Sequence, residues 1–315
     1  MIDPVIRKLT KSDLAAADLI NREAFGTFFG LENPMDFRGD GDVVQGRFRA
    51  NPDGAFAADL DGELVACGFV MDWGSVGIFG PLTVDVKHWG KGIARAMMDA
   101  MVGYMDARGF ALQGLFTHPQ SAKHIRLYEE YGFRMQRITA VMDRQVDLSQ
   151  AMPPATMLYS SLGATAQRAA LEQCRSIAGT IEAGLDLSRE IQSIAQGGFG
   201  DTVLLRSEGQ PVGFACCHQG AGSEAGSGQT VVKFACVVPG PAAAEQFARL
   251  VEACAGFAAQ RGTARLVAGT NTGRSECYEA LLEYGFRTWM NGVAMIRPAT
   301  DGYNLPGIFA IDDWR

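Results

Sequence analysis

A short turn at Gly90 and Gly92 has the residue types of a phosphate-binding site. Residues 82–94 read L-T-V-D-V-K-H-W-G-K-G-I-A, which is a strand alternation, a glycine turn and the start of a helix. Glycine lets a backbone approach a ligand where a Cβ would collide. A helix N-terminus adds unpaired N–H groups and the positive end of the helix dipole. The segment therefore predicts phosphate binding by residues 90–95.

Two common phosphate-binding motifs are excluded. The chain has no G-x-x-x-x-G-K-[ST], so the loop of nucleoside triphosphatases is missing. It also has no G-x-G-x-x-G, so the dinucleotide fingerprint is missing. The phosphate must belong to another kind of ligand.

The segment resembles the acyl-CoA signature of the GNAT N-acetyltransferases, L-x-V-x-P-x-x-[QR]-x-x-G-x-[GA]. Val86 stands where this family usually has Pro, and Trp89 stands where it has Gln or Arg. Residues 127–133, L-Y-E-E-Y-G-F, resemble a second family motif, L-Y-x-x-x-G-F. Four positions of the first motif match in register: Leu82, Val84, Gly92 and Ala94.

The resemblance implies direct transfer of an acyl group from acetyl-CoA, or another acyl-CoA, to a small amine. No metal is implied. The strand would bind the pantetheine amides, and the turn would bind the pyrophosphate. Lys123 and Arg126 could meet the 3′-phosphate of CoA, or could simply be an exposed helix face. The residues expected to bind the cosubstrate are Val84, Asp85, Val86, Trp89, Gly90, Lys91, Gly92, Ile93, Ala94 and Arg95.

Acyl transfer to an amine requires an acid for the leaving thiolate and a base for the ammonium proton. The resemblance implies that Tyr128 is the general acid. Three residues remain candidates for the general base: Asp85 on the signature strand, Asp72 at a strand end, and His118, whose imidazole titrates near neutrality.

Three aromatic residues, Phe28, Phe29 and Phe37, lie in the segment that borders the acceptor site in GNAT folds. They could line that site or pack in an ordinary core. Aspartates stand nearby at positions 36, 40 and 42. Together these residues suggest a small amine with an apolar body as the acceptor.

The candidate residues would be positioned by strands and helices that alternate along the first half of the chain. The hydrophobic pattern predicts a helix over 13–25 with Ser12 as its N-cap, and another over 42–50. Hairpin strands are expected over 55–60 and 63–72, and a third strand over 76–86. Helices over 93–108 and 121–131 should alternate with strands over 112–117 and 133–146. The fold class is α+β, with two GNAT-like domains, each a mixed, mostly antiparallel sheet with helices on both faces.

The second half repeats the first at an offset of 153 residues. The segment E-Y-G-F-R at 130–134 recurs at 283–287, since 283 − 130 = 153. At this offset Gly90 and Gly92 correspond to Ala243 and Glu245, and Tyr128 corresponds to Leu281. We therefore expect an active GNAT domain at 1–148, a linker at 149–156, and a non-catalytic GNAT-like domain with a C-terminal tail at 157–315.

The composition of the chain limits its expected binding partners and its expected cellular compartment. The chain has 315 residues and a net charge of −7, which argues against nucleic-acid binding. It has no apolar run long enough to span a membrane and no signal peptide, and its seven cysteines show no metal or disulfide spacing. These features favour a cytoplasmic enzyme, as a monomer with an internal pseudo-dimer or as a homodimer. The alternative function is a non-catalytic acyl-CoA sensor or interaction protein.

Overall fold

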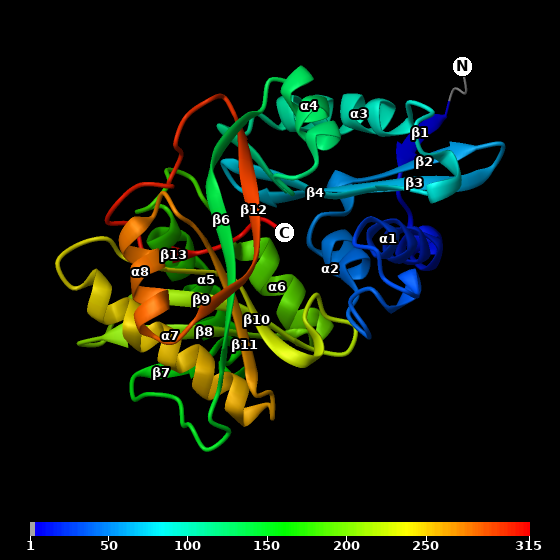
Figure 1. Cartoon of the computed structure of the whole chain (residues 1–315). Coiled ribbons are helices and arrows are strands. Elements are labelled where there is room, and N and C mark those ends of the chain that lie inside the picture. The colour runs from blue at the N-terminus through cyan, green and yellow to red at the C-terminus, as the bar shows by residue number, and fades with distance from the viewer. Residues whose placement is uncertain (1–3) are drawn as a thin grey trace.

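The computed structural model describes residues 4–315, and its strands join into one sheet that runs through the molecule (Figure 1). The strand order is β1-β2-β3-β4-β5-β12-β6-β11-β10-β9-β8-β7, and β13 pairs with β10. The first half of the chain contributes β1 (Val5–Lys8), α1 (Leu14–Phe28), α2 (Val43–Ala50), β2 (Ala55–Leu60), β3 (Glu63–Trp73), β4 (Val76–Val84), α3 (Ile93–Arg108), β5 (Leu112–Thr117), α4 (Ala122–Glu130) and β6 (Arg134–Gln145).

The second half repeats this order of elements. From β4 onward the match follows the offset of 153: α4 shifted by 153 gives the bounds of α8, since 122 + 153 = 275 and 130 + 153 = 283. The elements are β7 (Thr156–Leu158), α5 (Ala164–Ala178), α6 (Ser188–Gly197), β8 (Gly200–Ser207), β9 (Gln210–Gly220), β10 (Gly226–Val237), α7 (Ala243–Gln260), β11 (Arg265–Asn271), α8 (Ser275–Glu283), β12 (Arg287–Arg297) and β13 (Ala310–Ile311).

Local sequence explains most of the element boundaries. Asp61 and Gly62 have positive φ values of 52° and 85°, as a two-residue hairpin turn between β2 and β3 requires. The Asp42 carboxylate accepts a hydrogen bond from the Gln45 N–H at 2.9 Å and caps α2. The expected cap of α1 is wrong: Ser12 lies in a 3-10 turn, Lys11–Asp13, which begins at Thr10.

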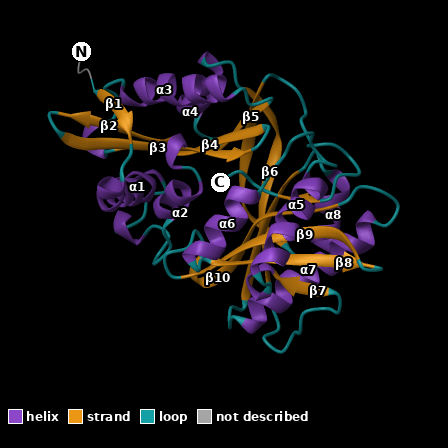
Figure 2. Ribbon diagram, turned by 180° about the vertical axis from the view of Figure 1, so that it is seen from behind, coloured by secondary structure: helices purple, strands orange, loops and turns teal. Residues whose placement is uncertain are grey.

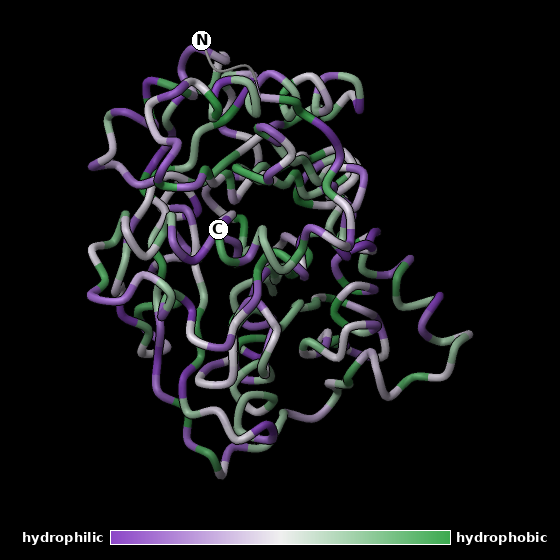
Figure 3. The backbone as a smooth tube through the Cα atoms, turned by 90° about the vertical axis from the view of Figure 1, so that its right-hand side faces the viewer, coloured by the Kyte–Doolittle hydropathy of each residue, from purple (hydrophilic) through white to green (hydrophobic). Residues whose placement is uncertain are grey.

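Helices cover both faces of the sheet in each half, which confirms the predicted α+β class. In Figures 1 and 2, α1 and α2 lie on one side of β2–β4, and α3 and α4 lie on the other. The hydropathy colouring of Figure 3 shows hydrophobic stretches in the interior and hydrophilic stretches in many outer loops. A buried cluster that includes Trp73, Phe234 and Trp314 joins side chains from both halves.

The two halves exchange their last long strands. β5 pairs not with β6 but with β12, through contacts such as Val293 opposite Thr117. In turn, β6 pairs with β11, where Thr139 lies opposite Asn271. β6 and β12 then pair antiparallel with each other in the middle of the sheet. Each half of the sheet is therefore completed by a strand from the other half of the chain.

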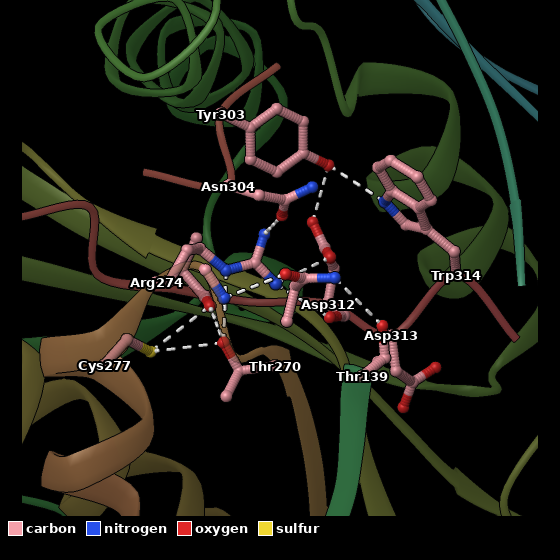
Figure 4. Close-up of polar contacts among 12 residues, drawn as sticks. Thr139, Thr270, Arg274, Cys277, Tyr303, Asn304, Asp312, Asp313 and Trp314 are labelled. Carbon is pink, nitrogen blue, oxygen red and sulfur yellow. Dashed lines mark hydrogen bonds and ion pairs between the residues drawn. The ribbon is translucent and has the colours of Figure 1, made fainter. Parts of the chain in front are cut away.

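The segment after β12 returns across the second half and ends at the centre of the molecule, between the two halves (Figures 1 and 3). Figure 4 shows how it is held: the buried Arg274 guanidinium donates to the Asp312 carboxylate and to Asn304, each at 3.0 Å. The Tyr303 hydroxyl donates to Asp312 at 2.6 Å and accepts from the Trp314 indole at 3.0 Å. Within the tail, β13 pairs antiparallel with β10 and lies against β11.

We predict that the two sequence-defined domains, residues 1–148 and 157–315, are not independent monomers. Made alone, residues 1–148 lose β12 from the edge of β5 and expose β6, and unpaired strand edges associate or unfold. Light scattering and thermal unfolding should show an oligomer or a less stable protein, and co-expression should restore a 1:1 complex. The prediction would be contradicted if both fragments were stable monomers that unfold at the same temperature as the intact chain.

Candidate functional site

The candidate site of the first half lies where β4 and β5 stop pairing. These parallel strands pair from Val76 opposite Leu112 to Phe79 opposite Leu115. Beyond Phe79, β4 continues to Val84 and pairs only with β3 on its other edge. The β4–β5 gap, as we call the space beyond this last pair, therefore leaves one edge of β4 without a strand partner. Such an edge can bind an extended ligand through its backbone groups.

The glycine turn lies at the end of this unpaired edge. Gly90 and Gly92 have φ values of +78° and +87°, which side chains with a Cβ rarely adopt. Gly92 is the N-cap of α3. Within residues 4–315, no backbone N–H from position 90 to position 94 donates a hydrogen bond. Ile93 and Ala94 thus offer the unpaired amides and positive dipole end that bind a phosphate.

The residues between β4 and the turn are partly used by the protein itself. The strand was expected to reach Val86 but ends at Val84, because the Asp85 carboxylate accepts from the Lys87 N–H at 2.9 Å and caps a 3-10 turn, Val86–His88. The exposed Trp89 donates its indole N–H to the Val84 carbonyl at 2.7 Å. Asp85 therefore has a structural role in this turn.

Basic side chains lie at the start of α3 and on α4. Lys91 is exposed and lies 3.4 Å from the His88 ring nitrogen. Arg95 is exposed and forms an ion pair with Glu130 of α4. Lys123 and Arg126 are exposed on α4. Lys91, Lys123 and Arg126 form no ion pair within residues 4–315, so all three can meet a phosphate.

Tyr128 lies over the point where the gap begins. Its ring packs edge-on against Phe79, the last β4 residue that pairs with β5, with ring centres 5.4 Å apart. Tyr128 is half-buried, and burial of its hydroxyl raises the pKa to about 12. Within residues 4–315 the hydroxyl has no hydrogen-bond partner. It is a protonated phenol that can donate to a ligand.

The predicted acceptor residues and His118 come together. The His118 ring lies 5.3 Å from Phe28 and 5.1 Å from Phe29, and Phe29 lies 5.7 Å from Phe37. Burial lowers the pKa of His118, and the nearby charges of His124 and Arg315 lower it further. His118 is therefore neutral at neutral pH and can accept a proton.

Sequence reasoning missed His124, whose ring lies 5.5 Å from Phe28. Burial lowers the pKa of His124 as well. His124 and Tyr128 are four residues apart on α4, so they lie on one face of that helix. This spacing could have identified His124 from the sequence.

Asp72 lies near the C-terminal end of β3, away from the gap. It pairs with Gly77 near the start of β4, whereas the glycine turn follows the end of β4. Its carboxylate is buried, accepts from Arg108 at 2.6 Å, and accepts from the Gly74 N–H at 3.1 Å. These contacts place Asp72 in an ion pair that joins β3 to the end of α3.

The equivalent gap in the second half is filled by the chain itself. β10 and β11 pair only at Thr230–Leu266 and Val231–Val267. Beyond these pairs, β13 lies against β10 with Ile311 opposite Ala235, and the Ala310 carbonyl accepts from Thr270 at 3.2 Å. At the offset of 153, Ala235 corresponds to Leu82. The protein backbone therefore occupies the edge that stays unpaired in the first half.

The phosphate-binding features are also replaced. α7 begins at Ala243, so the positions of the glycine turn are helical residues in the second half. Lys123 and Arg126 correspond to Glu276 and Glu279, which line a surface pocket of about 470 Å³ together with Glu283. Like charges repel, so this surface opposes an anionic cosubstrate.

No helix in residues 4–315 is long and apolar enough to cross a membrane. In the same part of the chain, no group of three or more His, Cys, Asp or Glu residues is placed to hold a metal ion.

Comparison with known proteins supports the resemblance. Residues 19–133 match the model of the acetyltransferase (GNAT) family. No curated protein sequence matches the chain. Among solved structures, a candidate acetyltransferase from Pyrococcus horikoshii has a TM-score of 0.68 at 15% identity, over 99% of this chain and 95% of that protein. A GCN5-related N-acetyltransferase from Sphaerobacter thermophilus has a TM-score of 0.57 at 15% identity, over 93% of this chain and 95% of that protein.

At these identities the structural similarity shows a shared fold, and it extends over both halves of the chain. The family match begins within α1 and runs past the end of α4, so it covers the elements that build the gap. Residues 19–133 therefore form a domain of the acetyltransferase (GNAT) family, and the chain as a whole shares the fold of GNAT proteins.

Proposed function

We propose that the first half of the chain is an N-acyltransferase that moves an acetyl group, or another acyl group, from CoA to a small amine. The observation that carries this proposal is the unpaired edge of β4, which leads to the unpaired amides at the start of α3. The protonated Tyr128 packs against Phe79 at the start of the gap, and the neutral His118 directly follows β5. These are the groups that thioester aminolysis requires.

The cosubstrate would bind along the unpaired edge of β4. The pyrophosphate would accept hydrogen bonds from the N–H groups at the start of α3, with Lys91 nearby. The 3′-phosphate would lie near Lys123 and Arg126 on α4. Trp89 would have to release the Val84 carbonyl if the pantetheine bonds to that group.

In the reaction, the neutral amine attacks the thioester carbonyl carbon. The C–N bond forms, the C–S bond breaks, and the electron pair of that bond leaves with sulfur. His118, directly or through water, takes the proton released by the nitrogen. Tyr128 gives its proton to the leaving thiolate and regains one from solvent. Asp85 and Asp72 are less suited as bases, because one caps a turn and the other is paired with Arg108.

The second half would not catalyse the reaction. Leu281, at the position of Tyr128, has no proton to give, and β13 occupies the equivalent gap. The competing function is an acyl-CoA sensor that binds the cosubstrate without transfer. Thiol release from acetyl-CoA over a panel of amines separates the two, because a sensor binds CoA but releases no thiol with any amine.

Binding should be limited to one CoA per chain, and Gly92→Glu should abolish it. The substitution forces a side chain into a left-handed position and places a negative charge at the phosphate turn. Isothermal titration with CoA is the measurement. Gly62→Glu is the matched control, since Gly62 has a φ of +85° in an exposed hairpin turn. Two equivalent sites per chain, or unchanged binding by Gly92→Glu, would contradict this prediction.

Tyr128→Phe should lower kcat by roughly 100-fold or more, the usual scale for a positioned proton donor. CoA affinity should change little, because the ring still packs on Phe79. Tyr284→Phe, a half-buried tyrosine of the second half, is the control and should leave kcat unchanged. An unaltered kcat in Tyr128→Phe would remove this hydroxyl from the mechanism.

The pH dependence of kcat tests His118. Its pKa lies below the ordinary value of about 6.5, so the base form should persist at neutral pH and be lost as the pH falls through the lowered pKa. The rate should therefore be flat near pH 7 and fall on the acid side. His118→Gln should lower kcat and remove this fall, whereas His124→Gln should keep it. The reverse pattern would assign the base to His124.

A further inference from the structure

The acceptor side of the β4–β5 gap is built partly by the second half of the chain. β12 pairs with β5 only as far as Val293 opposite Thr117, and its largely exposed residues 287–291 then continue past the end of β5. The Phe116 ring packs over Gly292 of β12 and lies 5.5 Å from His118. Any ligand that reaches His118 from this side must pass residues of the exchanged strand.

The loop that follows α1 is fixed by the second half as well. The Asp42 N–H donates to the Ser223 carbonyl at 2.9 Å, and the Asp40 carboxylate accepts from the Ser227 hydroxyl at 2.6 Å. The third aspartate, Asp36, accepts from Asn33 at 2.9 Å. These carboxylates hold the loop and cap α2, so they do not form a site for a cationic group of the acceptor.

The last residue of the tail, Arg315, adds a guanidinium next to these contacts between the two halves. The Arg315 carbonyl accepts from the buried Lys233 at 3.0 Å and also from the buried Arg47. The Arg315 side chain pairs with Asp313 at 2.8 Å and lies 5.9 Å from the Trp289 ring of β12. Its charge acts on both His118 and Arg38.

Arg38 lies against this group through the Glu224 backbone. The guanidinium donates to the Glu224 backbone carbonyl at 3.3 Å, and no carboxylate within residues 4–315 forms an ion pair with it. The residue is exposed. The protein around it lowers its pKa to about 10, and the charges of Arg315 and Arg47 add to this effect, while the carboxylates of Glu224 and Asp313 act in the opposite direction. Arg38 also lies 5.4 Å from the Phe37 ring, which stacks on Phe29 next to His118.

We propose that the acceptor is an amine that also carries a carboxylate, and that Arg38, with Arg315 of the tail behind it, binds this carboxylate. A guanidinium matches a carboxylate with two parallel N–H donors, and an unpaired one gains most from this contact. The aromatic residues between Arg38 and His118 would contact the apolar body of the acceptor, with its amine toward His118. This inference rests on the proposed acyltransferase function.

The first test compares amino acids with their amides as acceptors, using thiol release from acetyl-CoA by the full chain. Each pair differs only in the carboxylate. We expect kcat/KM to favour the acids by roughly 10-fold or more, the scale of a charged hydrogen bond. Equal or better use of the amides would overturn the inference and leave the acyltransferase function intact. Absence of thiol release with every amine would count against the acyltransferase function itself.

The second test substitutes the cation. Arg38→Gln should raise KM for an acid acceptor by roughly 10- to 100-fold, while KM for acetyl-CoA and kcat/KM for the matching amide stay within about 2-fold. Arg38→Lys should recover part of the loss. Arg261→Gln removes the same charge from an exposed residue after α7 and should change none of these constants. An equal loss with acid and amide acceptors would show a structural role for Arg38 and overturn the proposal.

Discussion

The antiparallel pairing of β6 with β12 is the contact on which the rest of the structure depends. Each strand comes from one half of the chain and completes the sheet of the other half. Separating the halves would break backbone hydrogen bonds on both edges of these strands and expose the shared buried cluster around Trp73, Phe234 and Trp314. The two repeats thus share one sheet, and parts of the second repeat lie beside the candidate site of the first.

In each half, two parallel strands stop pairing partway along their length: β4 and β5 in the first half, and β10 and β11 in the second. The edge that this leaves is treated differently in the two halves. In the first half, the edge of β4 beyond Phe79 has no strand partner and leads to a glycine turn with unpaired amides. In the second half, the corresponding edge of β10 is satisfied by β13, and a regular helical turn replaces the glycines. An unpaired backbone edge is costly to bury, so the chain either closes it with its own strand or keeps it available for a ligand.

Buried charges hold the seam between the halves. Arg47 of α2 pairs with Glu224 at 2.8 Å, and Lys233 of β10 also binds this carboxylate. Burial alone would raise the pKa of Glu224, but the charges of Arg47 and Lys233 hold it below its ordinary value. A buried charge that loses its partner is strongly destabilising, so this group favours a single arrangement of the halves. In this arrangement Lys233 also donates to the Arg315 carbonyl, and this hydrogen bond holds the end of the tail at the seam.

The sequence by itself determined the elements, because their signals are local. Hydrophobic periodicity, turn residues and helix ends predicted the bounds of α3 and β5, and the recurring E-Y-G-F-R segment predicted that the second half repeats the first at an offset of 153. The glycine turn and Tyr128 were also found from the sequence, since family motifs hold them at a fixed spacing along the chain. Phe28, Phe29 and Phe37 were grouped as acceptor residues only by inference from the family's fold, and the structure places their rings around His118, which had been a separate candidate for the base.

Only the tertiary structure decided which repeat supplies each strand. β6 and β12 are copies with similar alternation, so no local signal says that β5 pairs with the distant copy. Asp72 was a candidate base because it ends a strand, but the sequence does not show which side chains lie next to it. In the structure its neighbour is Arg108, with which it forms an ion pair. Arg47 and Arg315 lie 268 residues apart, and only the folded chain lets the Arg47 guanidinium donate to the Arg315 carbonyl. Strand pairing and charge contacts between distant segments depend on backbone geometry that residue patterns do not encode.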